Sequence, residues 1–184
     1  MLQIEIPEIE LYNSEKDEFT YIKSQRLQLE HSLMSLSKWE SKWCKPFLSK
    51  EEKTPEQTID YIRCMTIGTP ASPEVYTMIA YNEETIKQIK DYIDAPMTAT
   101  WFSEKEGQSQ KRSKEIVTAE LIYYWMIALQ IPFECEKWHL NKLLTLIKVC
   151  NIKNTPSKKM PKKEIYSRNK ALNEARRMKY NSKG

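Results

Sequence analysis

The first thirty residues alternate between apolar and polar side chains, which is typical of strands with one buried face. Pro7 interrupts the alternation and confines the first strand to an edge or a break, and a polar stretch at 13–17 divides the segment. The pattern predicts a β-hairpin or small meander over residues 1–30, with positions 27–29 in a third strand. The alternating apolar residues are Leu2, Ile4, Ile6, Ile9, Leu11, Phe19, Tyr21, Leu27 and Leu29.

From residue 31 the apolar spacing becomes helical, and residues 31–150 are predicted to form a helical body in one domain with the β element. Pro46 ends the first helical segment. The sequence Thr54-Pro55-Glu56-Gln57 is a capping box with proline at the first helical position, and it predicts a helix through about Met65. The apolar residues of the first segment are Leu33, Leu36, Trp39, Trp43 and Phe47.

Two shorter helices are predicted from their boundary residues. Ser72-Pro73-Glu74 has the order of an N-cap, proline and acid, and predicts a helix to about Ala80. Asn82 begins another helix, which ends near Asp94 because Pro96 prevents its continuation. A polar loop at 103–112 follows.

The region 113–150 is predicted to form an antiparallel helical hairpin that is the core of the body. Ser113 can cap a helix whose second half is apolar on every side, so this helix should be the most buried one. Pro132 then opens a second helix after a very short connection. We expect Trp125 and Leu144 to be deeply buried here. The stripe of the second helix consists of Phe133, Leu140, Leu143, Leu144 and Ile147.

The composition excludes several classes of function. The chain of 184 residues has three glycines, too scattered for a phosphate-binding loop. Its longest apolar run, 121–129, is too short for a membrane helix. The first ten residues carry no basic side chain and no long apolar core, so no secretory signal is predicted. The four cysteines have no paired spacing, and we expect reduced thiols in a cytosolic protein without cofactors.

The charge distribution is uneven. Residues 151–184 contain eleven lysines and arginines and two acids, a formal charge of +9, while the other 150 residues contain 18 basic and 23 acidic residues, a charge of −5. The tail is predicted to comprise a linker to Pro161 and a basic helix over 162–179. It is a candidate contact for an acidic protein or for nucleic acid, with a solvated extension as the alternative. The candidate partner-binding residues of the tail are Arg168, Arg176, Arg177, Lys179 and Tyr180.

The protein-partner interpretation is favoured because guanidinium groups pair with carboxylates in a fork, and because no base-reading module accompanies the charge. Tyr166 and Tyr180 leave stacking on nucleic acid open as the alternative. A second candidate contact is Trp101-Phe102, beside the polar loop, where an exposed aromatic pair can anchor a partner.

Catalytic and metal sites are weakly indicated. Cys135 and His139 stand four residues apart on one face of the predicted helix, but Cys150 is too distant to complete a metal site, so packing is favoured. Glu120 interrupts an apolar helix, either as a functional acid or, more simply, as a buried group bonded to lysine or tyrosine. His31 is expected to form a hydrogen bond at the junction of strand and helix. We expect no metal and no enzymatic activity.

Four stretches carry a family resemblance: EHSLMSLSKWESKWCKPFLSKEEKT (30–54), DAPMTATWF (94–102), CEKWHLNKLLTLIKVCNIKN (135–154) and SRNKALNEARRMKYNSKG (167–184). They resemble a family of small tail-morphogenesis proteins of siphovirus-type bacteriophages and prophages of Gram-positive gut bacteria. This family is similar in size, helical content and setting among tail genes to the tail assembly chaperones, an analogy at the level of the fold.

The resemblance implies a non-catalytic protein that binds the tape measure protein and assists tail tube assembly. It implies the tape measure and tail tube proteins as partners, with self-association left open and no role for a membrane. The expected location is the host cytoplasm, or alternatively the virion tail. Two other functions stay open: nucleic-acid binding through residues 151–184, and a structural role as a tail or head–tail connector component.

Overall fold

The computed structural model describes residues 1–13, 17–102, 116–155 and 162–181. It is mainly helical with small N-terminal antiparallel sheets of two strands each, which confirms the predicted fold class. The chain divides into two compact units, Met1–Asn151 and Ile152–Gly184. The predicted loop at 103–112 and its neighbour Ser113 lie outside the described residues.

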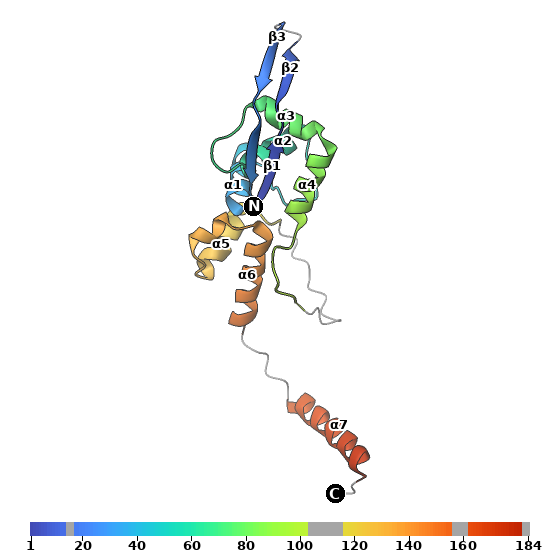
Figure 1. Ribbon diagram of the computed structural model, residues 1–184. Coiled ribbons are helices and arrows are strands. Elements are labelled where there is room, and N and C mark those ends of the chain that lie inside the picture. The colour runs from blue at the N-terminus through green and yellow to red at the C-terminus, as the bar shows by residue number, and fades with distance from the viewer. Residues whose placement is uncertain (14–16, 103–115, 156–161, 182–184) are drawn as a thin grey trace. The chain divides into compact units, whose positions relative to one another are not determined.

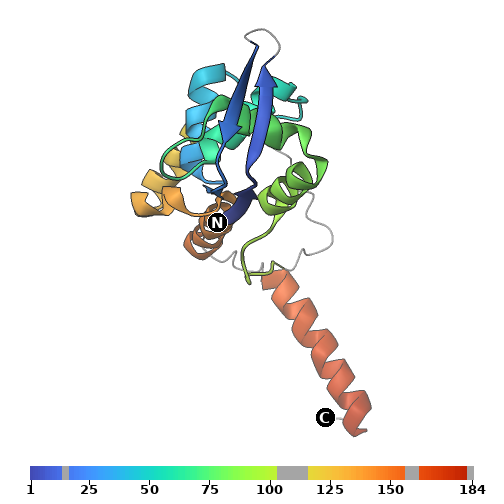
Figure 2. The same ribbon diagram turned by 45° about the horizontal axis from the view of Figure 1, so that its top comes forward.

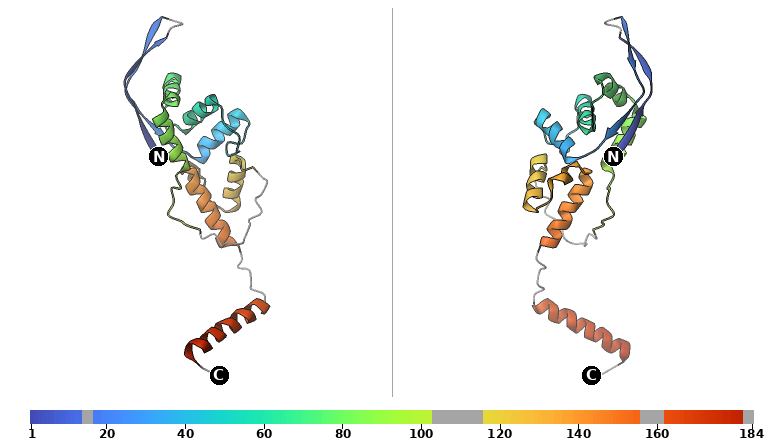
Figure 3. Two further views of the ribbon diagram at one scale, coloured as in Figure 1. Left: turned by 90° about the vertical axis from the view of Figure 1, so that its right-hand side faces the viewer. Right: turned by 60° about the vertical axis from the view of Figure 1, so that its left-hand side comes forward.

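The N-terminal segment is one antiparallel ribbon with a break, seen from two sides in Figure 3. Strand β1 (Leu2–Ile6) pairs with β4 (Gln25–Leu29), and β2 (Ile9–Asn13) pairs with β3 (Glu18–Ile22). The register is continuous across the break, because Ile6 lies opposite Gln25 and Ile9 lies opposite Ile22. Residues 25–29 therefore continue the second side of the hairpin and do not add a third strand beside it.

Pro7 marks the place where the buried face of the ribbon changes. In β1 the even-numbered Ile4 and Ile6 are buried, whereas beyond the break the buried side chain is Ile22, opposite the odd-numbered Ile9. The other face of the outer ribbon carries Tyr12 and Phe19, which are exposed. The β2–β3 end of the ribbon projects past the helices in the views of Figures 1 and 3.

The first core cluster is formed by side chains of the ribbon and of four helices, and Figure 2 shows the ribbon in front of these helices. These are α1 (Leu33–Trp43), α2 (Pro55–Met65), α3 (Pro73–Tyr81) and α4 (Glu83–Asp94). All four were predicted. Helix α1 ends at Trp43, because Cys44 adopts a left-handed φ of 50° and donates its backbone N–H to the backbone carbonyl of Glu40. The capping box of Thr54 and Gln57 is present in both directions, with N···O distances of 3.0 and 3.3 Å.

The second core cluster is formed by α1, α5 (Ala119–Ala128), a 3-10 helix η1 (Phe133–Lys137) and α6 (Leu140–Asn154). The predicted cap of α5 at Ser113 is wrong, because residues 116–118 are not helical and Thr118 caps the helix. Its end is a Schellman-type turn, in which Gln130 has a φ of 54° and the Ile131 N–H bonds to the Met126 carbonyl at 2.8 Å. Pro132 opens the 3-10 helix instead of an α-helix.

The predicted burial of this region is wrong in part. Helix α5 buries one face only, and its other face exposes Tyr124 and Ile127. Trp125 and Leu144 are partly buried, while Phe133 is exposed because it belongs to η1 and not to the stripe of α6. The largest fully buried side chains of α5 and α6 are Ile122, Met126, Leu140 and Leu143.

Candidate functional site

The basic tail contains helix α7 (Lys162–Tyr180), one residue longer than predicted. It has seven lysines and arginines and two acids, and every side chain that the structure describes along it is exposed. Such a helix buries almost no apolar surface of its own. The exposed side chains of α7 are therefore accessible to a partner.

The helical period distributes the predicted contact residues over α7 unequally. At about 100° per residue, Arg168 and Arg176 lie within about 60° of Leu172, on the face that also carries Ile165 and Lys179. Arg177 is about 100° further around the helix. Tyr180 is exposed at the last helical position, with the Lys179 ammonium 5.6 Å from its ring centroid. One face of α7 thus combines two aliphatic side chains with three cations.

The aromatic pair at 101–102 lies in the first unit. Trp101 is 90 % exposed, the most exposed large apolar side chain among the described residues. Phe102 is half-buried, and the Lys148 ammonium of α6 lies 4.2 Å from its ring centroid. The segment before this aromatic pair is attached to α6 by Asn141, whose side-chain amide donates to the carbonyls of Ile93 and Ala95 at 2.9 Å each.

The two predicted contacts belong to different units, and only Trp101 and Phe102 are placed together with parts of the helical body. The exposure of Trp101 agrees with an anchoring role without testing it. The sequence alone indicated the aromatic pair beside a polar loop. It gave no local signal for the contact of Phe102 with Lys148, because these residues are 46 positions apart.

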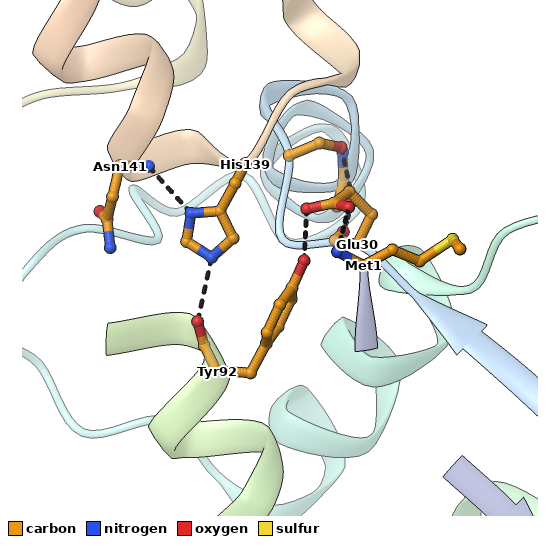
Figure 4. A network of polar contacts seen from close by, with 7 residues as sticks. Met1, Glu30, Tyr92, His139 and Asn141 are labelled. Carbon is orange, nitrogen blue, oxygen red and sulfur yellow. Dashed lines mark hydrogen bonds and ion pairs between the residues drawn. The ribbon is translucent and has the colours of Figure 1, made fainter. Parts of the chain in front are cut away.

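A buried polar network joins the ribbon to α2, α4 and α6, and part of it is shown in Figure 4. The His31 Nδ1 lies 2.5 Å from the Tyr61 hydroxyl, as expected for a histidine that bonds at the strand–helix junction. The Tyr92 hydroxyl donates to the Glu30 carboxylate at 2.6 Å, and the amino group of Met1 lies 3.0 Å from the same carboxylate. The side chain of Glu30 had not been identified from the sequence.

His139 has both ring nitrogens engaged. The Asn141 backbone N–H donates to Nδ1 at 3.3 Å, which leaves Nε2–H to donate to the Tyr92 carbonyl at 3.0 Å. Its ring packs edge-on against His31, with centroids 5.2 Å apart. Cys135 lies in η1, which ends before His139, so the two side chains do not form the predicted i, i+4 pair of one helix. Both ring nitrogens of His139 already have partners within the protein. Among the described residues, no group of three or more metal-ligating side chains is placed to hold an ion.

The environment keeps His31, His139 and Tyr92 neutral at pH 7. Burial, and secondly the nearby His139, lowers the pKa of His31 to about 4. Burial also lowers the pKa of His139, against the opposing effect of its bond to the Tyr92 carbonyl. Burial and the bond to Glu30 raise the pKa of Tyr92. The network thus combines neutral histidine and tyrosine side chains with the ion pair of Met1 and Glu30, and its mutual bonds fix the secondary-structure elements that carry them.

Glu40 is a buried acid of the body, whereas Glu120 is not. Glu120 is exposed at the start of α5, so both interpretations of it as a buried group are wrong. The Glu40 carboxylate accepts the backbone N–H groups of Phe47 at 2.8 Å and of Ala119 at 2.7 Å. The partner at 119 is 79 residues away in sequence, which is why spacing could not reveal this role.

No protein-family model matches the chain, and neither a curated protein nor a solved structure shows significant similarity to it. Within the described part of the chain, no helix is long and apolar enough to span a membrane.

Proposed function

We propose that this chain is a non-catalytic protein of phage tail morphogenesis, similar to the tail assembly chaperones, that binds the tape measure protein and assists tail tube assembly. The family resemblance of the sequence motivates the phage assignment. The observation that carries the binding role is α7, whose described side chains are exposed and whose arginine-bearing face suits an acidic helical partner.

In this proposal the helical body covers apolar or coiled-coil segments of the tape measure protein, keeps them from aggregating, and releases them as tube subunits arrive. The expected place is the host cytoplasm. The proposal assigns His31, His139, Tyr92 and Glu40 to the support of the fold, since each is bonded to other groups of the protein.

The test is a co-expression pull-down of the tape measure protein. Arg176→Lys with Arg177→Lys keeps the charge but removes the guanidinium fork, so we expect capture to fall several-fold. Lys170→Arg keeps the same charge in the same helix and should leave capture unchanged. Capture that is equal in all three proteins would contradict an arginine–carboxylate contact.

Nucleic-acid binding is the second candidate, because Tyr166 and Tyr180 are exposed among the basic residues of α7. It predicts tight binding of DNA or RNA at about 150 mM salt that is indifferent to the arginine-to-lysine exchange, with a steep dependence on salt. The chaperone proposal predicts only weak, sequence-indifferent binding. A structural tail or connector role is distinguished by mass spectrometry of purified virions, which would contain the chain in that case.

A further inference from the structure

A small apolar pocket lies between α2 and α4, next to the segment that follows α1. Its volume is about 100 Å³. Its lining includes the stacked rings of Phe47 and Tyr61, whose centroids are 3.9 Å apart. The aliphatic wall consists of Ile62, Ile86, Ile89 and Ile93.

The size of the pocket sets the size of its occupant. Sites for whole small molecules have volumes of about 300–1,000 Å³. An apolar cavity of about 150 Å³ holds one benzene molecule. The pocket between α2 and α4 therefore matches a single branched aliphatic side chain, the kind of anchor on which a protein contact often depends.

Two lysines stand at the pocket and define the charge of what enters it. The Lys53 ammonium lies 5.0 Å from the centroid of the Phe47 ring and donates to the carbonyls of Ser49 and Glu51 at 3.1 and 3.2 Å. Lys90 lines the pocket from α4 and is exposed. Among the residues that the structure describes, no carboxylate forms an ion pair with either lysine.

The surroundings of Lys53 are poorly solvated. Burial lowers its pKa, with the nearby Glu51 carboxylate acting in the opposite direction. An ammonium group in such a place gains from an incoming carboxylate more than a fully solvated one does. A cationic or neutral ligand would instead bring no carboxylate to pair with either lysine.

We propose that this pocket receives one aliphatic side chain of an acidic peptide segment, with the flanking carboxylates paired to Lys53 and Lys90. The inference does not rest on α7, the observation that carries the proposed function, and it defines one specific contact on the helical body together with the chemistry of the segment bound there. The charge argument disfavours α7 of a second copy as the occupant, because arginine and lysine flank the aliphatic residues of α7.

The experiment is an NMR titration of the full-length protein labelled at its isoleucine methyl groups. The probe is the peptide Ac-Glu-Glu-Leu-Glu-Glu-NH2. We expect saturable shifts of the methyl groups of the four pocket isoleucines, with a Kd in the millimolar range. The peptides with serine in place of leucine, or with lysine in place of every glutamate, should bind at least tenfold more weakly.

Variants of the two lysines test the charge independently of the pocket's shape. Lys53→Gln with Lys90→Gln should raise the Kd about tenfold, whereas Lys87→Gln, on α4 but outside the pocket, should not change it. Thr58→Phe, which puts a larger side chain at a lining position on α2, should abolish the shifts. Because the lysine variants alter exposed and half-buried side chains, they remain informative if the Thr58 variant fails to fold.

The proposal is overturned if the serine peptide binds as well as the leucine peptide, if the shifts lie elsewhere, or if the lysine variants bind normally. It is also overturned if the methyl signals shift with protein concentration alone, which would show a second copy in the pocket. Failure here leaves the proposed function intact, because the pull-down tests the arginines of α7 with the pocket unaltered.

Discussion

At the scale of single residues, the five tryptophans have very different surroundings. Trp39 is 1 % exposed, and its indole N–H donates to the Gln57 carbonyl at 2.9 Å, whereas Trp101 is 90 % exposed. We expect Trp39→Ala to lower the free energy of unfolding by about 3–5 kcal/mol, as for other large-to-small changes in a close-packed core. Trp101→Ala should stay within about 0.5 kcal/mol of the wild type.

Urea unfolding followed by circular dichroism measures both variants. Trp125→Ala serves as the intermediate case, because its side chain is only partly buried. Equal midpoints for the variants at positions 39 and 101 would show that the burial ranking does not govern stability here.

His31 predicts a dependence of stability on pH. Its pKa is about 4 in the folded protein, against 6.5 for an unperturbed histidine, so below pH 6.5 the unfolded chain takes up a proton that the folded chain excludes. The contribution of His31 to the free energy of unfolding is therefore present in full above pH 6.5. It falls by about 3 kcal/mol as the pH drops to about 4. The groups that face the ring are Tyr61 and His139.

The comparison that isolates this contribution is His31→Gln against wild type, in urea titrations between about pH 7 and pH 4.5. The variant should lose less stability over this range, since the carboxylates contribute to both proteins alike. Parallel curves would assign the acid sensitivity to other groups.

At the scale of elements, the Glu40 carboxylate links the start of α5 to the segment after α1. Glu40→Ala leaves the N–H groups of Phe47 and Ala119 without their acceptor, and each unmade bond of this kind costs about 1–3 kcal/mol. We therefore expect a loss of about 2–6 kcal/mol in the free energy of unfolding. Glu120→Ala is the matched control, an exposed acid in the first turn of α5, and should be nearly neutral.

Unfolding midpoints of the two glutamate variants provide the measurement. A neutral Glu40→Ala would mean that water or a local shift replaces the carboxylate at both amides.

At the scale of the whole molecule, we expect the body to fold without the tail. Residues 1–151 form one compact unit that contains both core clusters, while every described side chain of α7 is exposed. A chain ending after Asn154 should melt cooperatively with a nearly unchanged midpoint in calorimetry, because α7 buries too little apolar surface to offset an ordering cost of about 1–2 kcal/mol per residue. A truncated chain that aggregates would contradict this.

The sequence alone was sufficient for features that depend on neighbouring residues. Thr54 and Gln57 cap α2, Pro73 begins α3, and α4 ends before Pro96, because caps and prolines act within one turn of the chain. The excess of basic residues in the tail is likewise a property of composition. The proposed contact residues of α7 follow from it, together with the helical period.

Only the tertiary structure decided features that join distant residues. The start of α5 depends on Thr118 and on the Glu40 carboxylate from α1, and the exposed face of α5 depends on which side the helix presents to Leu33 and Leu36. An all-apolar helix carries no periodic signal to choose that side.

The pocket at α2 and α4 shows the same limit for the candidate sites. Phe47, Lys53 and Lys90 come from three segments with no shared spacing, so no local pattern places them together. Short-range steric and hydrogen-bonding preferences could be predicted from the sequence. The pairing of surfaces depends on shape and charge across the fold, which a linear sequence does not contain.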